Sequence, residues 1–156
     1  MIRRSITLAL LLTLTPFAGA QERTAPGDIP AFVDGRTPIV LTDTERAFIR
    51  NEMRGFLAGI QEILEASANG DGKRAAAAGR SIGMNGPEKD HIPKSLAPKL
   101  PMEFKQLGLA THRGFDQIAD AAERDGGANA PKQLGLLMQN CVACHGTWRI
   151  AGEGGK

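Results

Sequence analysis

The chain has 156 residues and carries 19 basic side chains (Lys and Arg) against 17 acidic ones (Asp and Glu), a formal net charge of +2. Hydrophobic residues make up 42% of the sequence, aromatic residues only 4%, and tyrosine is absent. This length indicates one domain, and the nearly balanced charge argues against a nucleic-acid-binding protein. A core with so few aromatic side chains has to be built from Leu, Ile, Ala, Met and Phe, a set that suits packed helices.

The first twenty residues have the three parts of a secretory signal peptide. Arg3 and Arg4 are followed by a nearly continuous apolar run over residues 6–17, and residues 18–20 (Ala-Gly-Ala) supply a small-residue cleavage site. The run is well short of the about 20 residues that a membrane-spanning helix needs. We therefore expect cleavage after Ala20 and export to the periplasm without a membrane span. The loss of Arg3 and Arg4 would leave basic and acidic residues equal in number.

Four segments have the apolar periodicity of amphipathic helices, and no segment alternates in the manner of a strand. The predicted helices run from the capping pair Thr42-Asp43 to about 69, over about 73–84, over about 102–125, and from Pro131 to about 151. Glycine-rich turns join the first helix to the second and the third to the fourth. The pattern predicts an all-α protein, an antiparallel four-helix bundle over residues 42–151.

Two segments outside these helices are rich in proline. Residues 21–41 have no sustained period and are predicted to be irregular. Residues 85–101 are predicted to form a long crossover loop, and a loop of this length in a compact domain is often functional. Their prolines are Pro87, Pro93, Pro98 and Pro101.

The strongest chemical signal is the sequence Cys-Val-Ala-Cys-His over residues 141–145. C-x-x-C-H is the attachment signature of c-type haem. On a helix the two sulfur atoms lie about one turn apart, close enough to bond both vinyl groups of one porphyrin, and the histidine that follows can ligate the iron. We expect one covalent haem c on Cys141 and Cys144, with His145 as the proximal axial ligand.

Three other interpretations of the cysteine pair stay open: a disulfide, a thioredoxin-type redox pair and a zinc site. The oxidising compartment of an exported protein favours disulfides. A redox C-x-x-C opens a helix that follows a strand, whereas this pair lies near the end of the last predicted helix. Zinc needs four ligands, and only His91 and His112 remain to complete the set.

A leader peptide, four helices and a C-x-x-C-H on the last helix resemble the class II c-type cytochromes, the family of cytochrome c′ and its low-spin relatives. The resemblance covers about residues 42–151. It extends to Trp148 and Arg149, because the family usually reads C-x-x-C-H-x-x-aromatic-Arg. Four residues return to the same helix face, so Arg149 is expected beside His145 in the haem environment, with a solvated surface arginine as the alternative.

The sixth iron ligand of this family comes from the first helix, where Met53 stands on the apolar stripe. The resemblance implies Met53 as the distal axial ligand, although a methionine at helical spacing is more often a packing residue. With Met53 directed elsewhere, Ile49 or Phe56 would cover an open distal face. Poorer candidate ligands are Met84, Met102 and Met138.

Other polar residues have less specific expectations. Arg46, Arg50 and Arg54 recur on one helix face, where Arg50 either contacts the haem propionates or belongs to a solvated salt-bridge face. His112 is expected to be a partly exposed helix residue rather than a ligand, and His91 a loop residue.

These features predict a periplasmic monohaem cytochrome that carries single electrons and is not an enzyme. One alternative is a five-coordinate protein of the cytochrome c′ type that binds a diatomic gas such as nitric oxide, and it depends on Met53. Another is the cytochrome subunit of a larger periplasmic oxidoreductase. The redox partner protein stays unidentified. The resemblance also raises the question of a homodimer, because many class II relatives pair through their first two helices. The short second helix predicted here argues against such pairing, so the homodimer stays open.

Overall fold

The computed structural model describes residues 34–154. The predicted signal peptide and residues 21–33 of the predicted irregular segment lie outside that range. The described chain is mostly helical, as predicted. Its elements in order are β1 (Thr37–Leu41), α1 (Asp43–Ala68), α2 (Gly72–Ser81), the short 3-10 helices η1 (Pro87–His91) and η2 (Ala97–Lys99), α3 (Met102–Asp125), α4 (Ala130–Thr147) and β2 (Trp148–Gly152).

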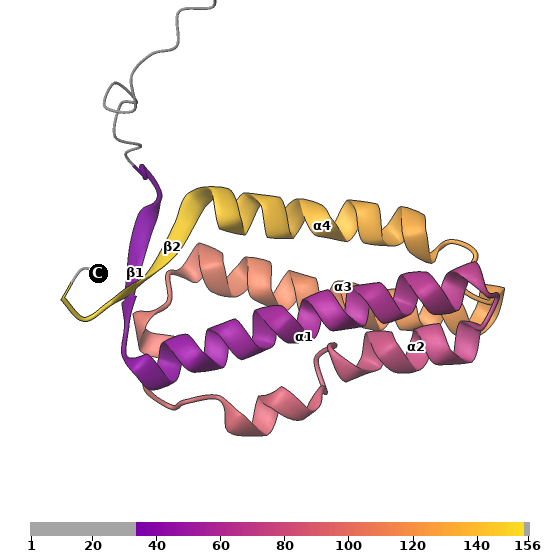
Figure 1. The fold of residues 1–156 in the computed structure, drawn as a ribbon, viewed down its shortest axis with the longest axis horizontal. Coiled ribbons are helices and arrows are strands. Elements are labelled where there is room, and N and C mark those ends of the chain that lie inside the picture. Colours follow the sequence, from indigo (N-terminus) through magenta and orange to yellow (C-terminus); the bar gives the residue numbers. More distant parts are fainter. Residues whose placement is uncertain (1–33, 155–156) are drawn as a thin grey trace, which may run out of the picture. The chain divides into compact units, whose positions relative to one another are not determined.

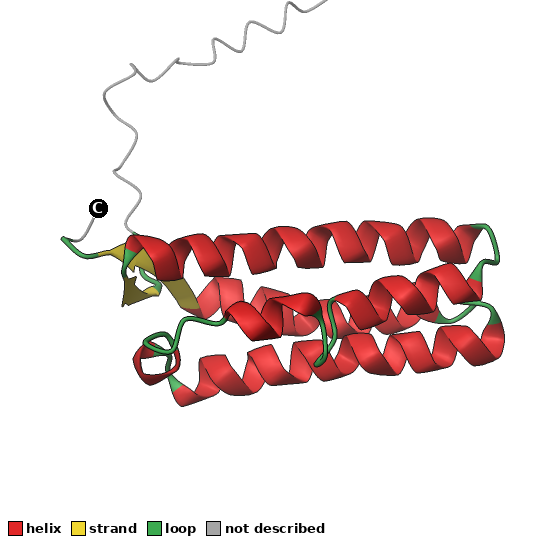
Figure 2. Cartoon of the chain, turned by 90° about the horizontal axis from the view of Figure 1, so that it is seen from below, coloured by secondary structure: helices red, strands yellow, loops and turns green. Residues whose placement is uncertain are grey.

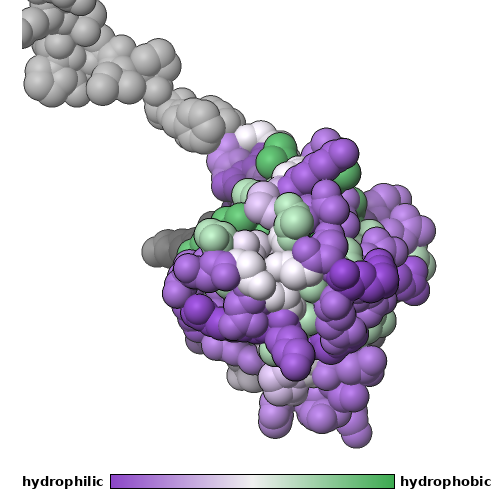
Figure 3. Space-filling model, turned by 90° about the vertical axis from the view of Figure 1, so that its right-hand side faces the viewer, coloured by the Kyte–Doolittle hydropathy of each residue, from purple (hydrophilic) through white to green (hydrophobic). Residues whose placement is uncertain are grey.

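The four α-helices lie side by side with their axes along the length of the molecule (Figures 1 and 2). Tight turns join α1 to α2 and α3 to α4 at one end. Gly70 and Gly126 take positive φ angles of 69° and 70° in these turns, a conformation that favours glycine. Figure 3 faces this end of the molecule, and its surface is mostly hydrophilic. The strands lie at the opposite end, where α1 begins and α4 ends.

The first helix begins where the sequence predicts. The Thr42 hydroxyl accepts a hydrogen bond from the backbone N–H of Glu45 at 3.3 Å, and the Glu45 carboxylate accepts one from the N–H of Thr42 at 2.9 Å. This reciprocal capping box satisfies two backbone donors that a helix start leaves without partners.

The second helix is shorter than predicted and ends at Ser81 instead of residue 84. Its small residues let its backbone approach α3 closely: a Cβ added at Gly72 would lie 2.3 Å from the carbonyl oxygen of Ala122. Beyond the helix, the N–H of Met84 donates to Asp116 at 3.0 Å, which turns the chain towards α3. The predicted crossover therefore starts earlier and contains η1 and η2.

Two strands contradict the expectation that no strand is present. β1 pairs with β2 in parallel, with Thr37 opposite Trp148 and Leu41 opposite Gly152. The predicted irregular segment 21–41 thus contains a strand, and the last helix ends at Thr147 instead of continuing to 151. Trp148 is extended, with φ −120° and ψ 153°. Ile39 and Leu41 of β1 are buried, and this burial favours strand pairing over a further helical turn.

The core is densest in the half of the molecule away from the strands. There Ile63, Phe115, Ile118 and Leu134 form one buried cluster, and alanines of α1, α2 and α3 form another. The half near the strands holds a third cluster, built around Ile39, Leu41, Ile49 and Leu96. Many of its members are only half-buried: Phe48, Met53, Leu100, Phe104, Trp148 and Ile150.

Glu45 joins the start of α1 to the crossover segment. Its side chain is 1% exposed, and its two carboxylate oxygens accept hydrogen bonds from the Ser95 hydroxyl and the Lys99 ammonium, each at 2.7 Å. The bond from Lys99, followed by that from Ser95, lowers the pKa of Glu45 from 4.5 to about 2. The charged carboxylate is therefore the form that holds residues 95–99 against α1.

This arrangement predicts an acid-dependent loss of stability. Because the folded-state pKa of Glu45 is lowered, its contribution is complete above about pH 4.5 and is lost as the pH falls towards 2. Glu45→Gln should lower the free energy of unfolding at pH 7 and flatten its pH dependence between pH 2 and 5. Urea unfolding at several pH values measures both. The control is Glu103→Gln, an exposed carboxylate in the first turn of α3. An unchanged pH profile in Glu45→Gln would contradict the assignment.

Among the helices of residues 34–154, none combines the length and the apolar character that crossing a bilayer requires.

Candidate haem-attachment site

The two cysteines and His145 lie in the last two turns of α4. Pro131 stands in the first turn of this helix, where a missing N–H costs nothing. Helical spacing puts Cys141 and Cys144 on the face that also carries Leu134 and Leu137. The motif therefore continues the inward face of the helix.

Burial along this inward face changes at the motif. Leu134 and Leu137 are buried, at 2% and 9% exposure. Cys141 and Cys144 are only half-buried, and His145 is exposed. Val142, between the cysteines, is 72% exposed. The inward face of α4 is thus packed by protein in its first half and left open where the motif begins.

Both cysteines are free thiols. Partial burial raises the pKa of the Cys141 thiol, and burial together with the neighbouring Cys141 raises that of Cys144. A redox C-x-x-C pair is activated by the opposite change, a lowered thiol pKa. The environment of this pair therefore does not activate it for redox exchange.

His145 is fixed through its backbone, which leaves its ring accessible. Its carbonyl oxygen accepts a hydrogen bond from Nη1 of Arg36 at 3.2 Å. The imidazole makes no hydrogen bond or ion pair with the residues that the structure describes. Two free thiols on adjacent turns and an accessible imidazole, all beside the open part of α4, fit a porphyrin held by two thioethers and one histidine.

Comparisons with protein-family models, curated proteins and solved structures found no match to this chain. Within residues 34–154, no three His, Cys, Asp or Glu side chains converge as a metal-binding group.

Met53 belongs to the half-buried cluster at the same end of the molecule. Met53 is a residue of α1, and it packs against the same buried cluster as Trp148, the third residue after His145. The indole ring of Trp148 meets the ring of Phe104 edge-on, with centroids 5.7 Å apart. Leu57, one turn beyond Met53, is 70% exposed. The apolar stripe of α1 is thus incompletely covered next to Met53, in keeping with the open face of α4.

The placement of Arg149 differs from the prediction. The expectation that it shares a helix face with His145 is wrong, because α4 ends at Thr147 and Arg149 stands in β2 opposite Pro38. Pairing with β1 thus sets the direction of this side chain. Arg50 is exposed on α1. The alternative that Arg50 belongs to a salt-bridge face has no support, because Arg50 forms no ion pair with the described residues. The neighbouring Arg46 pairs with Asp43.

The other histidines and methionines have other partners, are exposed, or lie away from the two cysteines and His145. Both ring nitrogens of His112 are engaged, Nδ1 with the carbonyl of Ile82 at 2.9 Å and Nε2 with the Glu52 carboxylate at 3.3 Å. The contact with Glu52 raises the pKa of His112. The candidates judged poorer lie elsewhere: His91 is exposed in η1, Met84 follows α2, and Met102 and Met138 are exposed.

Proposed function

We propose that this protein is an exported monohaem cytochrome of the class II type that carries single electrons. The observation that carries the proposal is the open inward face of α4, where the free thiols of Cys141 and Cys144 precede the accessible His145. A bound haem c supplies a reversible Fe(III)/Fe(II) couple. The periplasmic location and the unidentified redox partner belong to the same proposal.

The residues of this chain would hold, orient and shield that group. Cys141 and Cys144 anchor it to one helix, and His145 supplies the proximal nitrogen. The Arg36 contact fixes the backbone at His145. Trp148, packed edge-on against Phe104, would shield one side of the group from water, which would favour the less charged reduced iron.

We also propose that the four helices form an antiparallel bundle around the haem. Short turns join α1 to α2 and α3 to α4, and each helix packs against its neighbours in the chain. α1 and α4, which carry Met53 and His145, are the most sparsely packed of the neighbouring helix pairs. The proposed haem would lie between these two helices.

The direct test is the absorption spectrum of the exported protein, oxidised and reduced, with a haem stain after denaturing electrophoresis. We expect a stain that survives denaturation, because thioethers are covalent. In His145→Ala the stain should persist while the visible spectrum changes, since the proximal nitrogen is lost. His91→Ala, which changes an exposed histidine in η1, should leave the spectrum as in the wild type. A wild-type protein without covalent haem would overturn the proposal.

A further inference from the structure

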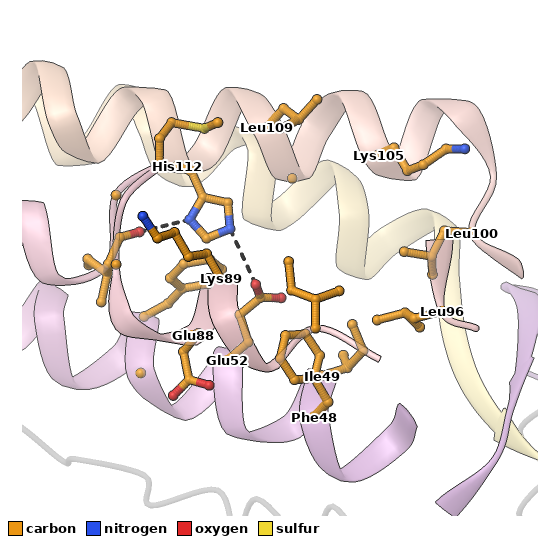
Figure 4. A pocket seen from close by; sticks show the side chains of 18 of the residues that line it. Phe48, Ile49, Glu52, Glu88, Lys89, Leu96, Leu100, Lys105, Leu109 and His112 are labelled. Atoms are coloured by element: carbon orange, nitrogen blue, oxygen red, sulfur yellow. Dashed lines mark hydrogen bonds and ion pairs between the residues drawn. The ribbon is translucent and has the colours of Figure 1, made fainter. Parts of the chain in front are cut away.

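A cavity of about 360 Å³ lies in the half of the molecule near the strands, between α1, α3 and the segment 81–100. Figure 4 shows it with side chains from these three parts converging on it. None of its lining residues belongs to α4. The cavity therefore contains neither the two cysteines nor His145, although Ile49 and Phe56, the residues expected to cover the distal face if Met53 points elsewhere, line it.

The walls of the cavity are mainly apolar and partly aromatic. Phe48, Phe56 and Phe104, three of the six phenylalanines of the chain, line it. Gly55 on α1 and Gly108 on α3 also line it, and a Cβ added at either would meet nothing within 4 Å. An apolar cavity of about 150 Å³ is enough to admit benzene. This one has room for a fused two-ring molecule.

One end of the cavity is polar. His112 donates from Nδ1 to the carbonyl of Ile82, since that carbonyl can only accept, and its Nε2 lies 3.3 Å from Oε1 of Glu52. The second oxygen of Glu52, Oε2, accepts no hydrogen bond from the described residues. Figure 4 places Glu52 and His112 together among the residues around the cavity. A ligand with a hydrogen-bond donor can therefore bind Glu52 without displacing His112.

The charges around the cavity favour an uncharged ligand. Lys89 and Lys105 line it along with Glu52 and Glu88. Each carboxylate has one oxygen engaged, Glu88 with Asn51 at 2.8 Å and Glu52 with His112, and it is the Glu52 carboxylate that lies with His112 at the polar end (Figure 4). An anionic ligand would meet Glu52 at the polar end, and a cationic one would meet His112 and two lysines. A neutral hydroxyl donates a hydrogen bond at no such cost.

We propose that this cavity binds a small, neutral aromatic molecule that bears a hydroxyl group, with the rings against the phenylalanines and the hydroxyl on Glu52. The residues proposed to hold the haem, on α4 and at Met53, do not line this cavity, so the two groups would be held by different residues.

Isothermal titration of the intact mature protein with three probes tests the ligand class. We expect 2-naphthol to bind, and naphthalene to bind about tenfold more weakly or worse, the factor that one hydrogen bond to a charged group provides. 2-Naphthoate should bind more weakly than 2-naphthol, since its carboxylate faces Glu52. No heat with 2-naphthol, or equal affinity for naphthalene or 2-naphthoate, would overturn the proposal.

Cavity-filling variants test the location. Gly108→Leu and Gly55→Leu fill the space from opposite walls, and each should weaken 2-naphthol binding about tenfold or more, since the leucine takes the volume of the rings. Gly135→Leu is the matched control, a helical glycine of α4 that also has nothing within 4 Å and does not line the cavity. Circular dichroism selects the variants that fold. Wild-type affinity in either folded cavity variant, or lost affinity in Gly135→Leu, would contradict the assignment.

Discussion

Replacing Cys141 and Cys144 together with alanine should remove the covalent haem and most of the helical structure. The inward face of α4 is fully buried only as far as Leu137, so the second half of this face would depend on the proposed haem for its cover. A group bound only by the folded state adds its binding free energy to folding. The haem stain and the far-ultraviolet circular dichroism of the double variant measure the two effects.

The control for this experiment is Val142→Ala, which changes the exposed residue between the two cysteines and leaves both thiols in place. We expect this variant to keep the haem and the fold. A double cysteine variant with the helix content and melting temperature of the wild type would show that the open face of α4 needs no cover.

The second large effect concerns Met53. Leucine conserves the volume of the side chain, so Met53→Leu should change the free energy of unfolding by less than about 1.5 kcal/mol. If Met53 is the distal ligand, the same variant should lose the sulfur-to-iron absorption band, become high-spin and bind carbon monoxide readily, because leucine offers the iron no electron pair. Visible absorption spectra with and without carbon monoxide measure the change.

The matched control is Met138→Leu, which removes a thioether from an exposed position on α4. It should leave the spectrum unaltered. If the wild-type protein is already high-spin and binds the gas, and Met53→Leu is indistinguishable from it, the electron-transfer proposal is wrong and the gas-binding alternative takes its place.

The helices follow from local chemistry and were predictable for that reason. Thr42 and Glu45 form a capping box within four residues, and Gly126 ends α3 in a left-handed conformation; both are signals within a single turn of chain. The positions of Cys141, Cys144 and His145 on one helix follow from their spacing in the same way.

The strands were missed because their signal is not local. Only Ile39 and Leu41 alternate with exposed residues in β1, and Pro38 disguises the pattern. Trp148 continues the apolar spacing of α4, so a sequence pattern cannot distinguish a further helical turn from an extended end. The pairing of β1 with β2 decides between these two conformations, and it joins residues that are more than 100 positions apart in the sequence. The error in Arg149 has the same origin.

The cavity could not be predicted for a related reason. Glu52, His112 and Ile82 come from three separate segments, and the carbonyl that orients His112 belongs to the backbone. The sequence predicted His112 only as a partly exposed helix residue. Only the folded chain brings it to Glu52.

The pairing of β1 with β2 also bears on the order in which the chain acquires its structure. The two strands are separated by all four helices, and contacts of such high sequence separation form slowly because a long loop must close first. Until β2 has paired with β1, the end of α4 lacks the strand contact that fixes the chain beyond it. We therefore expect the segment with Cys141 and Cys144 to be the last to become fixed, which leaves a period during folding when both thiols are accessible to a reagent.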